Sequence, residues 1–96
     1  MNVEEQEDYA ILELGGGNLE LIQKVDEAPF EKPQIKPPFC PHLALGTDDM
    51  ARTLKMIEEK RIPIVKGPLE IEGAEKWIYI RDPDNNVIEY IQWLSK

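Results

Sequence analysis

The last third of the chain constrains its fold more than any other part. Two apolar runs, 76–81 and 87–93, flank the polar segment 82–86, which reads Asp-Pro-Asp-Asn-Asn. Proline, aspartate and asparagine in such a cluster are typical of a tight turn, so two adjacent strands are expected here. Side chains alternate between the faces of a strand, which places Glu89 on an otherwise apolar face. Because an unpaired carboxylate in such a place is costly, Glu89 is expected to have a partner.

The only histidine of the chain, His42, lies in another apolar run, 39–46. A histidine and a glutamate that point from strands into a shared interior indicate a metal site. Neutral imidazole suits zinc, nickel, cobalt and iron, so the divalent metal could be any of these. Cys40 lies two residues from His42 and on the same face. It could be a soft sulfur ligand, but a buried cysteine that packs as a small apolar residue is the preferred reading.

Composition limits the partners and the location of the protein. A chain of 96 residues forms one small domain, 1–96. Its net charge of -8 argues against nucleic acid, since a phosphate backbone is bound through lysine and arginine. It holds no apolar run of membrane-spanning length, its acidic start does not resemble a signal peptide, and a lone cysteine makes no intrachain disulfide. We therefore expect a cytoplasmic protein that binds neither membrane nor nucleic acid.

One helix and several strands are expected elsewhere. Residues 49–60 carry apolar side chains at helical spacing behind a capping aspartate, and Pro63 prevents continuation. Residues 1–7 are expected to be disordered or frayed, and the proline-rich segment 26–38 to be an extended linker. The other expected strands are 9–14, 19–25, 39–46 and 62–66. The first two flank three glycines, which is typical of a hairpin.

Three segments resemble the vicinal oxygen chelate superfamily. Residues 79–91 are similar to the family's ending, which reads aromatic-x-x-D-P-D-G-x-x-I-E-L, and 41–45 leads into a capped helix in the family's manner. Residues 19–22 look like the end of a preceding module. This superfamily includes glyoxalase I (lactoylglutathione lyase), methylmalonyl-CoA epimerase, extradiol dioxygenases, and the fosfomycin and bleomycin resistance proteins.

The resemblance implies an α+β fold with a curved, mixed and mainly antiparallel sheet. The family pairs two βαβββ modules around one cavity that holds a divalent metal. Here 39–95 would be a complete second module, and 8–25 a two-stranded hairpin that ends an incomplete first module. The segment 26–38 would link them. The first strand, helix and second strand of the first module have no counterpart.

The resemblance also implies a set of metal ligands. In the family's metal isomerases each module offers one ligand from its first strand and a glutamate from its last. Carried over, Glu20, His42 and Glu89 would bind the metal, and Glu89 or Glu20 would be the catalytic base. The fourth ligand is missing, so either the chain is a truncated version of a longer protein or a second copy supplies the remainder. A two-fold homodimer would bring together two histidines and two glutamates.

The function implied by the resemblance is that of a metal-dependent isomerase or lyase of the glyoxalase I type. Such an enzyme moves a proton through a metal-bound enediolate of a small-molecule substrate. Trp77, Tyr79 and Arg81 share a strand face and are expected to bind that substrate. The alternative is plain core packing for the two aromatic side chains and exposure to solvent for Arg81. Glyoxalase I commonly has an asparagine where this chain has Lys24. An acyl-CoA epimerase, a non-catalytic binding protein of the bleomycin-resistance type and an inactive remnant therefore stay open.

Overall fold

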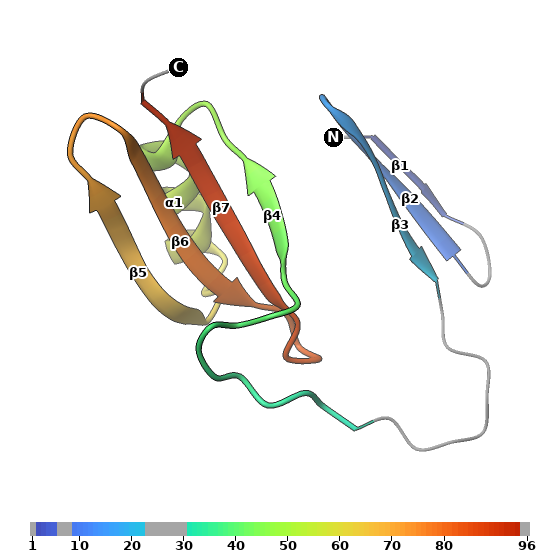
Figure 1. The fold of residues 1–96 in the computed structure, drawn as a ribbon. Coiled ribbons are helices and arrows are strands. Elements are labelled where there is room, and N and C mark those ends of the chain that lie inside the picture. Colours follow the sequence, from blue (N-terminus) through green and yellow to red (C-terminus); the bar gives the residue numbers. More distant parts are fainter. Residues whose placement is uncertain (1, 6–8, 23–30, 95–96) are drawn as a thin grey trace. The chain divides into compact units, whose positions relative to one another are not determined.

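The chain forms two compact units, Met1–Phe30 and Glu31–Lys96 (Figure 1). The computed structural model of the protein describes residues 2–5, 9–22 and 31–94. Within those residues, the one helix is too short to cross a membrane.

The first unit is an antiparallel sheet of three strands, β1 (Asn2–Glu5), β2 (Tyr9–Leu14) and β3 (Gly17–Ile22), in the order β1-β2-β3. Two glycines connect β2 to β3, and the residues on either side of them pair with each other. Glycine at both positions suits the two-residue turn of a hairpin. The predicted hairpin is therefore confirmed. Its second strand begins two residues before the predicted 19–25, whose last three residues lie outside the described part of the chain.

Residues 2–5 correct one expectation, because the sequence predicts disorder or fraying for 1–7. They form β1, which pairs with β2 from Asn2 opposite Glu13 to Glu5 opposite Ala10. An added strand satisfies backbone N–H and C=O groups at the open edge of β2, and this pairing needs no apolar side chain. An acidic run can therefore extend a sheet although its composition resembles that of a disordered tail.

The second unit has the element order βαβββ. Its elements are β4 (Leu43–Gly46), α1 (Met50–Glu59), β5 (Ile64–Ile71), β6 (Glu75–Arg81) and β7 (Val87–Trp93). The strands form one sheet in the order β4-β7-β6-β5, in which β4 runs parallel to β7 and the other neighbours are antiparallel. The predicted α+β fold, a hairpin followed by a βαβββ arrangement in a mixed sheet, is confirmed.

Helix α1 covers one face of this sheet (Figure 1). Asp49 caps it as predicted, because its Oδ1 accepts a hydrogen bond from the backbone N–H of Arg52 at 3.0 Å. Met50 and Ile57 are buried against Ile78 of the central strand β6, which is fully buried. Their spacing of seven residues returns to the same side of the helix, so α1 buries one stripe.

The opposite face of the sheet carries the alternate residues of β6 and β7. Tyr79 on β6 pairs with Glu89 on β7, and paired residues of antiparallel strands point to the same face. Ile78 and Ile80, one step along β6 on either side of Tyr79, pack toward α1 instead. Glu89 and Tyr79 therefore lie on the face that α1 leaves uncovered. This face is where the candidate site is built.

The turn between β6 and β7 is organised by Asp82. Its Oδ1 accepts hydrogen bonds from the backbone N–H groups of Asp84 at 2.9 Å and Asn86 at 2.7 Å, and its Oδ2 accepts from the Asn86 side chain at 2.8 Å. Asn85 takes the left-handed conformation, with φ 63°, which asparagine tolerates better than most residues. The turn sets the register that places Glu89 opposite Tyr79.

Replacing Asp82 with alanine is expected to lower the free energy of unfolding by about 1–3 kcal/mol, because three donors lose their acceptor at once. Urea denaturation followed by tryptophan fluorescence measures this loss. The matched control is Asp84→Ala, since only the backbone of Asp84 takes part in these bonds. Equal losses in the two variants would contradict the assigned role of Asp82.

Candidate metal centre

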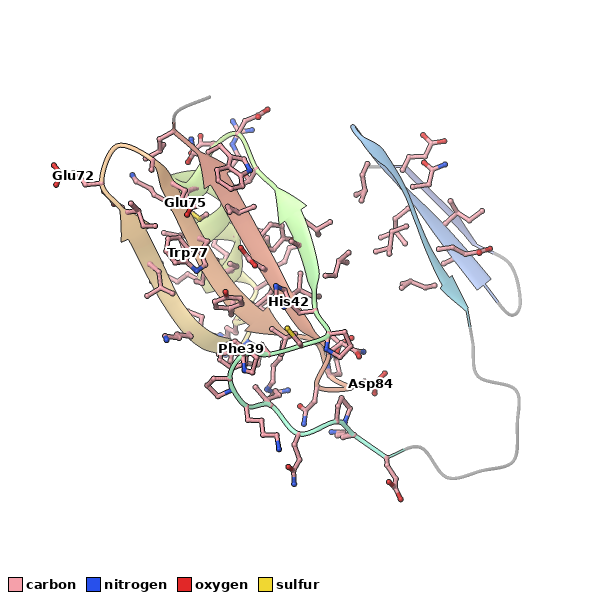
Figure 2. All side chains as sticks on the ribbon, in the orientation of Figure 1. Phe39, His42, Glu72, Glu75, Trp77 and Asp84 are labelled. Atoms are coloured by element: carbon pink, nitrogen blue, oxygen red, sulfur yellow. The ribbon has the colours of Figure 1, made fainter. Side chains whose placement is uncertain are left out.

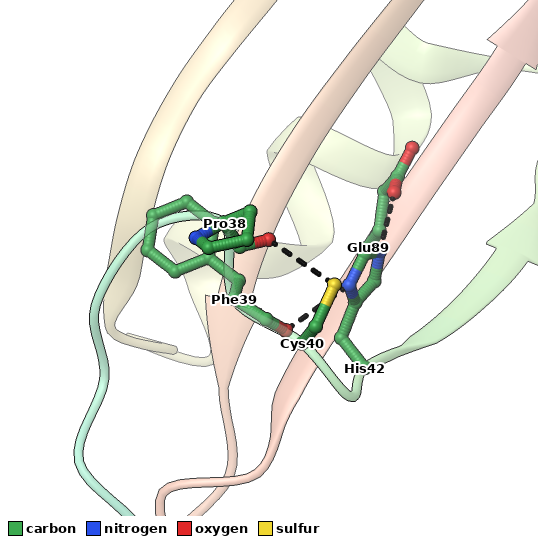
Figure 3. Close-up of polar contacts among 5 residues, drawn as sticks. All are labelled: Pro38, Phe39, Cys40, His42 and Glu89. Carbon is green, nitrogen blue, oxygen red and sulfur yellow. Dashed lines mark hydrogen bonds and ion pairs between the residues drawn. The ribbon is translucent and has the colours of Figure 1, made fainter.

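The site begins with a close contact between the only histidine and Glu89. His42 directly precedes β4, and Glu89 lies in the middle of β7, opposite Ala44 in the parallel pair. His42 Nε2 lies 2.9 Å from Glu89 Oε1, and the two side chains are 20% and 13% exposed (Figure 3). The sequence predicts that both side chains point from strands into a shared interior. The structure brings the two side chains together as predicted, but His42 lies just before β4 and not within a strand.

The segment that carries His42 differs from its predicted form. The sequence predicts a strand over 39–46, whereas β4 begins at Leu43. Prolines that lack an N–H flank Phe39 and Cys40, and Phe39 has a positive φ of 64°, so the backbone cannot continue a strand ladder through them. Residues 36–41 instead form an irregular strap that begins with a turn, in which the Phe39 N–H donates to the Lys36 carbonyl at 2.8 Å. The strap thus leads to His42 at the start of β4.

A backbone carbonyl fixes the orientation of the imidazole. His42 Nδ1 lies 3.1 Å from the carbonyl oxygen of Phe39. A carbonyl oxygen only accepts, so Nδ1 is assigned as the donor. Nε2 then faces a carboxylate oxygen of Glu89, which also only accepts when it is ionised. A positive species shared by the two atoms, either a proton or a metal ion, satisfies this arrangement.

Two aromatic rings support the imidazole. Tyr79 meets His42 edge to face, with ring centroids 5.6 Å apart and an interplanar angle of 82°. Phe39 packs on Tyr79 at 5.0 Å. That Phe39 orients His42 through its backbone carbonyl was not predicted from the sequence, because no sequence pattern reveals where a backbone carbonyl points. The prolines around Phe39 were the only available signal of an unusual backbone there.

The three residues predicted to bind substrate share the face of Glu89. Trp77, Tyr79 and Arg81 alternate along β6 and pair with residues of β7, and all three are half-buried. Arg81 Nη1 donates to the backbone carbonyl of Asp82 at 3.3 Å. Figure 2 places the labelled Trp77 and His42 on the sheet face opposite α1. Their binding of a substrate stays a prediction.

Two further predicted or possible ligands, Glu20 and Cys40, lie outside the strands that carry this contact. Glu20 belongs to the first unit, where it lies on β3 opposite Ile11 and is exposed. Its role as a ligand stays a prediction. Cys40 is exposed, so its preferred reading as a buried apolar residue is wrong. Its Sγ lies 3.7 Å from the carbonyl oxygen of Pro38, because the strap is a loop and not a core strand (Figure 3).

The donors present fit half of a metal centre. An imidazole nitrogen and a carboxylate oxygen are ligands that zinc and similar divalent ions accept. Catalytic zinc sites take three protein ligands and leave one position open. Among the described residues, no group of three or more His, Cys, Asp or Glu side chains is arranged to hold a metal ion. A complete centre therefore requires donors in addition to His42 and Glu89.

Comparison with known proteins agrees with the fold. A family model described as the Glyoxalase/Bleomycin resistance protein/Dioxygenase superfamily matches residues 1–90. A glyoxalase domain-containing protein of Mycosarcoma maydis is 39% identical over 83 residues, which cover 81% of this chain and 46% of that protein. The chain thus spans about half the length of this curated relative.

Solved structures of similar fold are known from several bacteria. A virulence protein from Salmonella typhimurium is 34% identical, with a TM-score of 0.62, over 88% of this chain and 70% of that chain. An integron cassette protein from Vibrio cholerae is 26% identical, with a TM-score of 0.67, over 96% and 75% of the two chains. A glyoxalase/dioxygenase from Nostoc punctiforme, 23% identical with a TM-score of 0.67 over 90% and 60%, shares the fold.

Proposed function

We propose that this chain, which belongs to the glyoxalase/bleomycin resistance protein/dioxygenase superfamily, is part of a cytoplasmic, metal-dependent isomerase or lyase of the glyoxalase I type. The observation that carries the proposal is the 2.9 Å contact between His42 Nε2 and Glu89 Oε1. Two residues 47 positions apart bring a nitrogen and an oxygen donor together on a half-buried sheet face. Such a pair would supply two of the three or four protein ligands that a zinc ion takes.

Each residue of the proposed site would have its own role in binding or catalysis. His42 and Glu89 would hold the ion, one of zinc, nickel, cobalt and iron, and the Phe39 carbonyl would keep His42 Nε2 directed at it. A bound ion would supply Lewis acidity that stabilises negative charge on substrate oxygens. Glu89 or Glu20 would accept a proton from the carbon beside the substrate carbonyl and return it to the neighbouring carbon. Trp77, Tyr79 and Arg81 would line the space for the substrate beside Glu89.

The missing ligands have two sources in this proposal. In the first, 8–25 ends an incomplete first module, 26–38 links it to the complete module 39–95, and Glu20 becomes the third ligand. In the second, a two-fold homodimer supplies another His42 and another Glu89, which makes a set of four donors. Exposed apolar side chains of the second unit support association, among them Trp93, which is 63% exposed.

A second candidate is a binding protein without a catalytic metal. The net charge of -8 and the exposed or half-buried aromatic rings Trp77, Tyr79 and Trp93 favour a cationic, planar ligand such as bleomycin. An acyl-CoA epimerase would use the same metal ligands as the leading proposal, but it would act on another substrate and return the proton to the carbon from which it came.

The test combines metal content with turnover. Protein purified without added metal is loaded in turn with zinc, nickel, cobalt and ferrous iron, and isomerisation of the hemithioacetal of methylglyoxal and glutathione, or epimerisation of an acyl-CoA, is followed. Activity should require metal and should be lost in Glu89→Gln but kept in Glu72→Gln, which lies in an exposed turn. Tight binding of bleomycin by metal-free protein, without turnover in any loaded form, would support the second candidate instead.

A further inference from the structure

A separate pocket lies beside the contact between His42 and Glu89. Its volume is about 300 Å³, at the lower end of the range for small-molecule sites. One wall is the proline-rich segment 33–41 and the other is the end of the β6–β7 turn with the start of β7. The side chain of Asn85 joins the two walls, because its Nδ2 donates to the Pro33 carbonyl at 3.3 Å.

The pocket combines apolar walls with a single charge. Proline rings, Phe39 and Val87 supply apolar surface, and Lys36 is the only charged residue of the lining. Within the described residues, Lys36 makes no ion pair. The chain as a whole has 19 acidic and 11 basic residues, so the positive charge of the pocket lining is opposite in sign to the net charge of the chain. An ammonium group beside an apolar wall favours a ligand with an anionic group and an apolar body.

The pocket adjoins the contact between His42 and Glu89. Val87, in the wall, lies two residues before Glu89 and on the same face of β7. Phe39, also in the wall, binds His42 through its carbonyl oxygen. One small molecule can therefore occupy the pocket with one end and reach His42 and Glu89 with the other.

We propose that the pocket binds the anionic end of a small organic acid, a carboxylate or a phosphate ester, with Lys36 as the residue that selects the charge. The anion site stands on the pocket itself. That the other end of the same molecule reaches His42 and Glu89 rests on the proposed function.

The lone cysteine allows a direct test with the full chain and no added metal. Cys40 is exposed and lines the pocket, so a bound molecule slows its alkylation by uncharged iodoacetamide. The probes are benzoate, phenyl phosphate and neutral benzamide, which share a ring and differ in charge. Benzoate, phenyl phosphate or both should protect Cys40 at lower concentration than benzamide does, and the better of the two identifies the anion. Equal protection by benzamide would overturn the proposal.

Substitutions identify the charge that selects the anion. In Lys36→Gln the half-protecting concentration should rise about twofold to fivefold, the effect expected of one exposed charge pair. Lys55→Gln, on the exposed face of α1, is the control and should leave it unchanged. An unchanged value in Lys36→Gln would overturn the proposal. The variant Glu89→Gln should lose metal binding, but the anion should still protect its Cys40 from alkylation. A failure of the proposed metal centre and a failure of the proposed anion pocket therefore give different results.

Discussion

Alanine in place of His42 is expected to reduce the affinity for zinc by a factor on the order of a hundred or more. His42 is the only histidine of the chain, so no other imidazole can replace it. Losing a residue that merely supports a ligand already costs about 10-fold to 100-fold in affinity, and losing the ligand itself costs at least as much. Calorimetric titration of metal-free protein with zinc measures the change.

Two further variants make the result specific. Glu89→Gln keeps the size of the side chain and removes its charge, and it should weaken zinc binding to a similar degree. Glu72→Gln removes an acidic group of the exposed β5–β6 turn and should bind zinc as the parent does. If His42→Ala kept the affinity of the parent protein, the zinc would be bound at another place and the proposed centre would be wrong.

Alanine in place of Ile78 is expected to lower the free energy of unfolding by about 2–5 kcal/mol, the usual cost of truncating a fully buried isoleucine. Ile78 has no exposed surface and lies in the central strand β6, where it packs against the buried stripe of α1. Single domains are stable by only about 5–15 kcal/mol, so this one change would remove a large part of the total. Chemical denaturation followed by circular dichroism gives the value.

The matched control is Ile71→Ala on the neighbouring strand β5. Ile71 is 50% exposed, so its truncation removes little buried surface and should cost less than about 1 kcal/mol. A cost for Ile78→Ala that is no greater than for Ile71→Ala would mean that the helix and sheet do not share the core described here.

The elements that could be predicted are those with a strong local pattern. The helix was predictable because apolar residues recur at helical spacing behind Asp49 and before Pro63, and α1 occupies that range. The final pair of strands was predictable from alternating apolar residues around the turn at 82–86. The convergence of His42 and Glu89 followed from the need of an inward carboxylate for a partner and from the family resemblance.

Other features depend on interactions that no local pattern contains. The strand β5 is longer than the predicted 62–66, because Gly67 and Pro68 looked like a turn. The strand β5 lies at the edge of the sheet, and its register with β6 shifts on either side of Lys66. At such irregular positions of an edge strand a proline need not donate a hydrogen bond, so β5 accommodates Gly67 and Pro68. The exposure of Cys40 and the hydrogen bond between the Phe39 carbonyl and His42 depend on the path of the backbone through the strap. That path is set by contacts with the sheet, such as that of Phe39 with Tyr79.

Magnetic resonance of the single histidine tests the proposed metal centre most directly. With the imidazole nitrogens labelled with nitrogen-15, the one histidine gives one set of signals, which distinguishes Nδ1 from Nε2 without mutation. On addition of zinc we expect the Nε2 signal to shift to the position of a metal-bound nitrogen, while Nδ1 keeps the proton that it donates to the Phe39 carbonyl. Zinc binding that leaves both nitrogen signals of His42 unchanged would contradict the account.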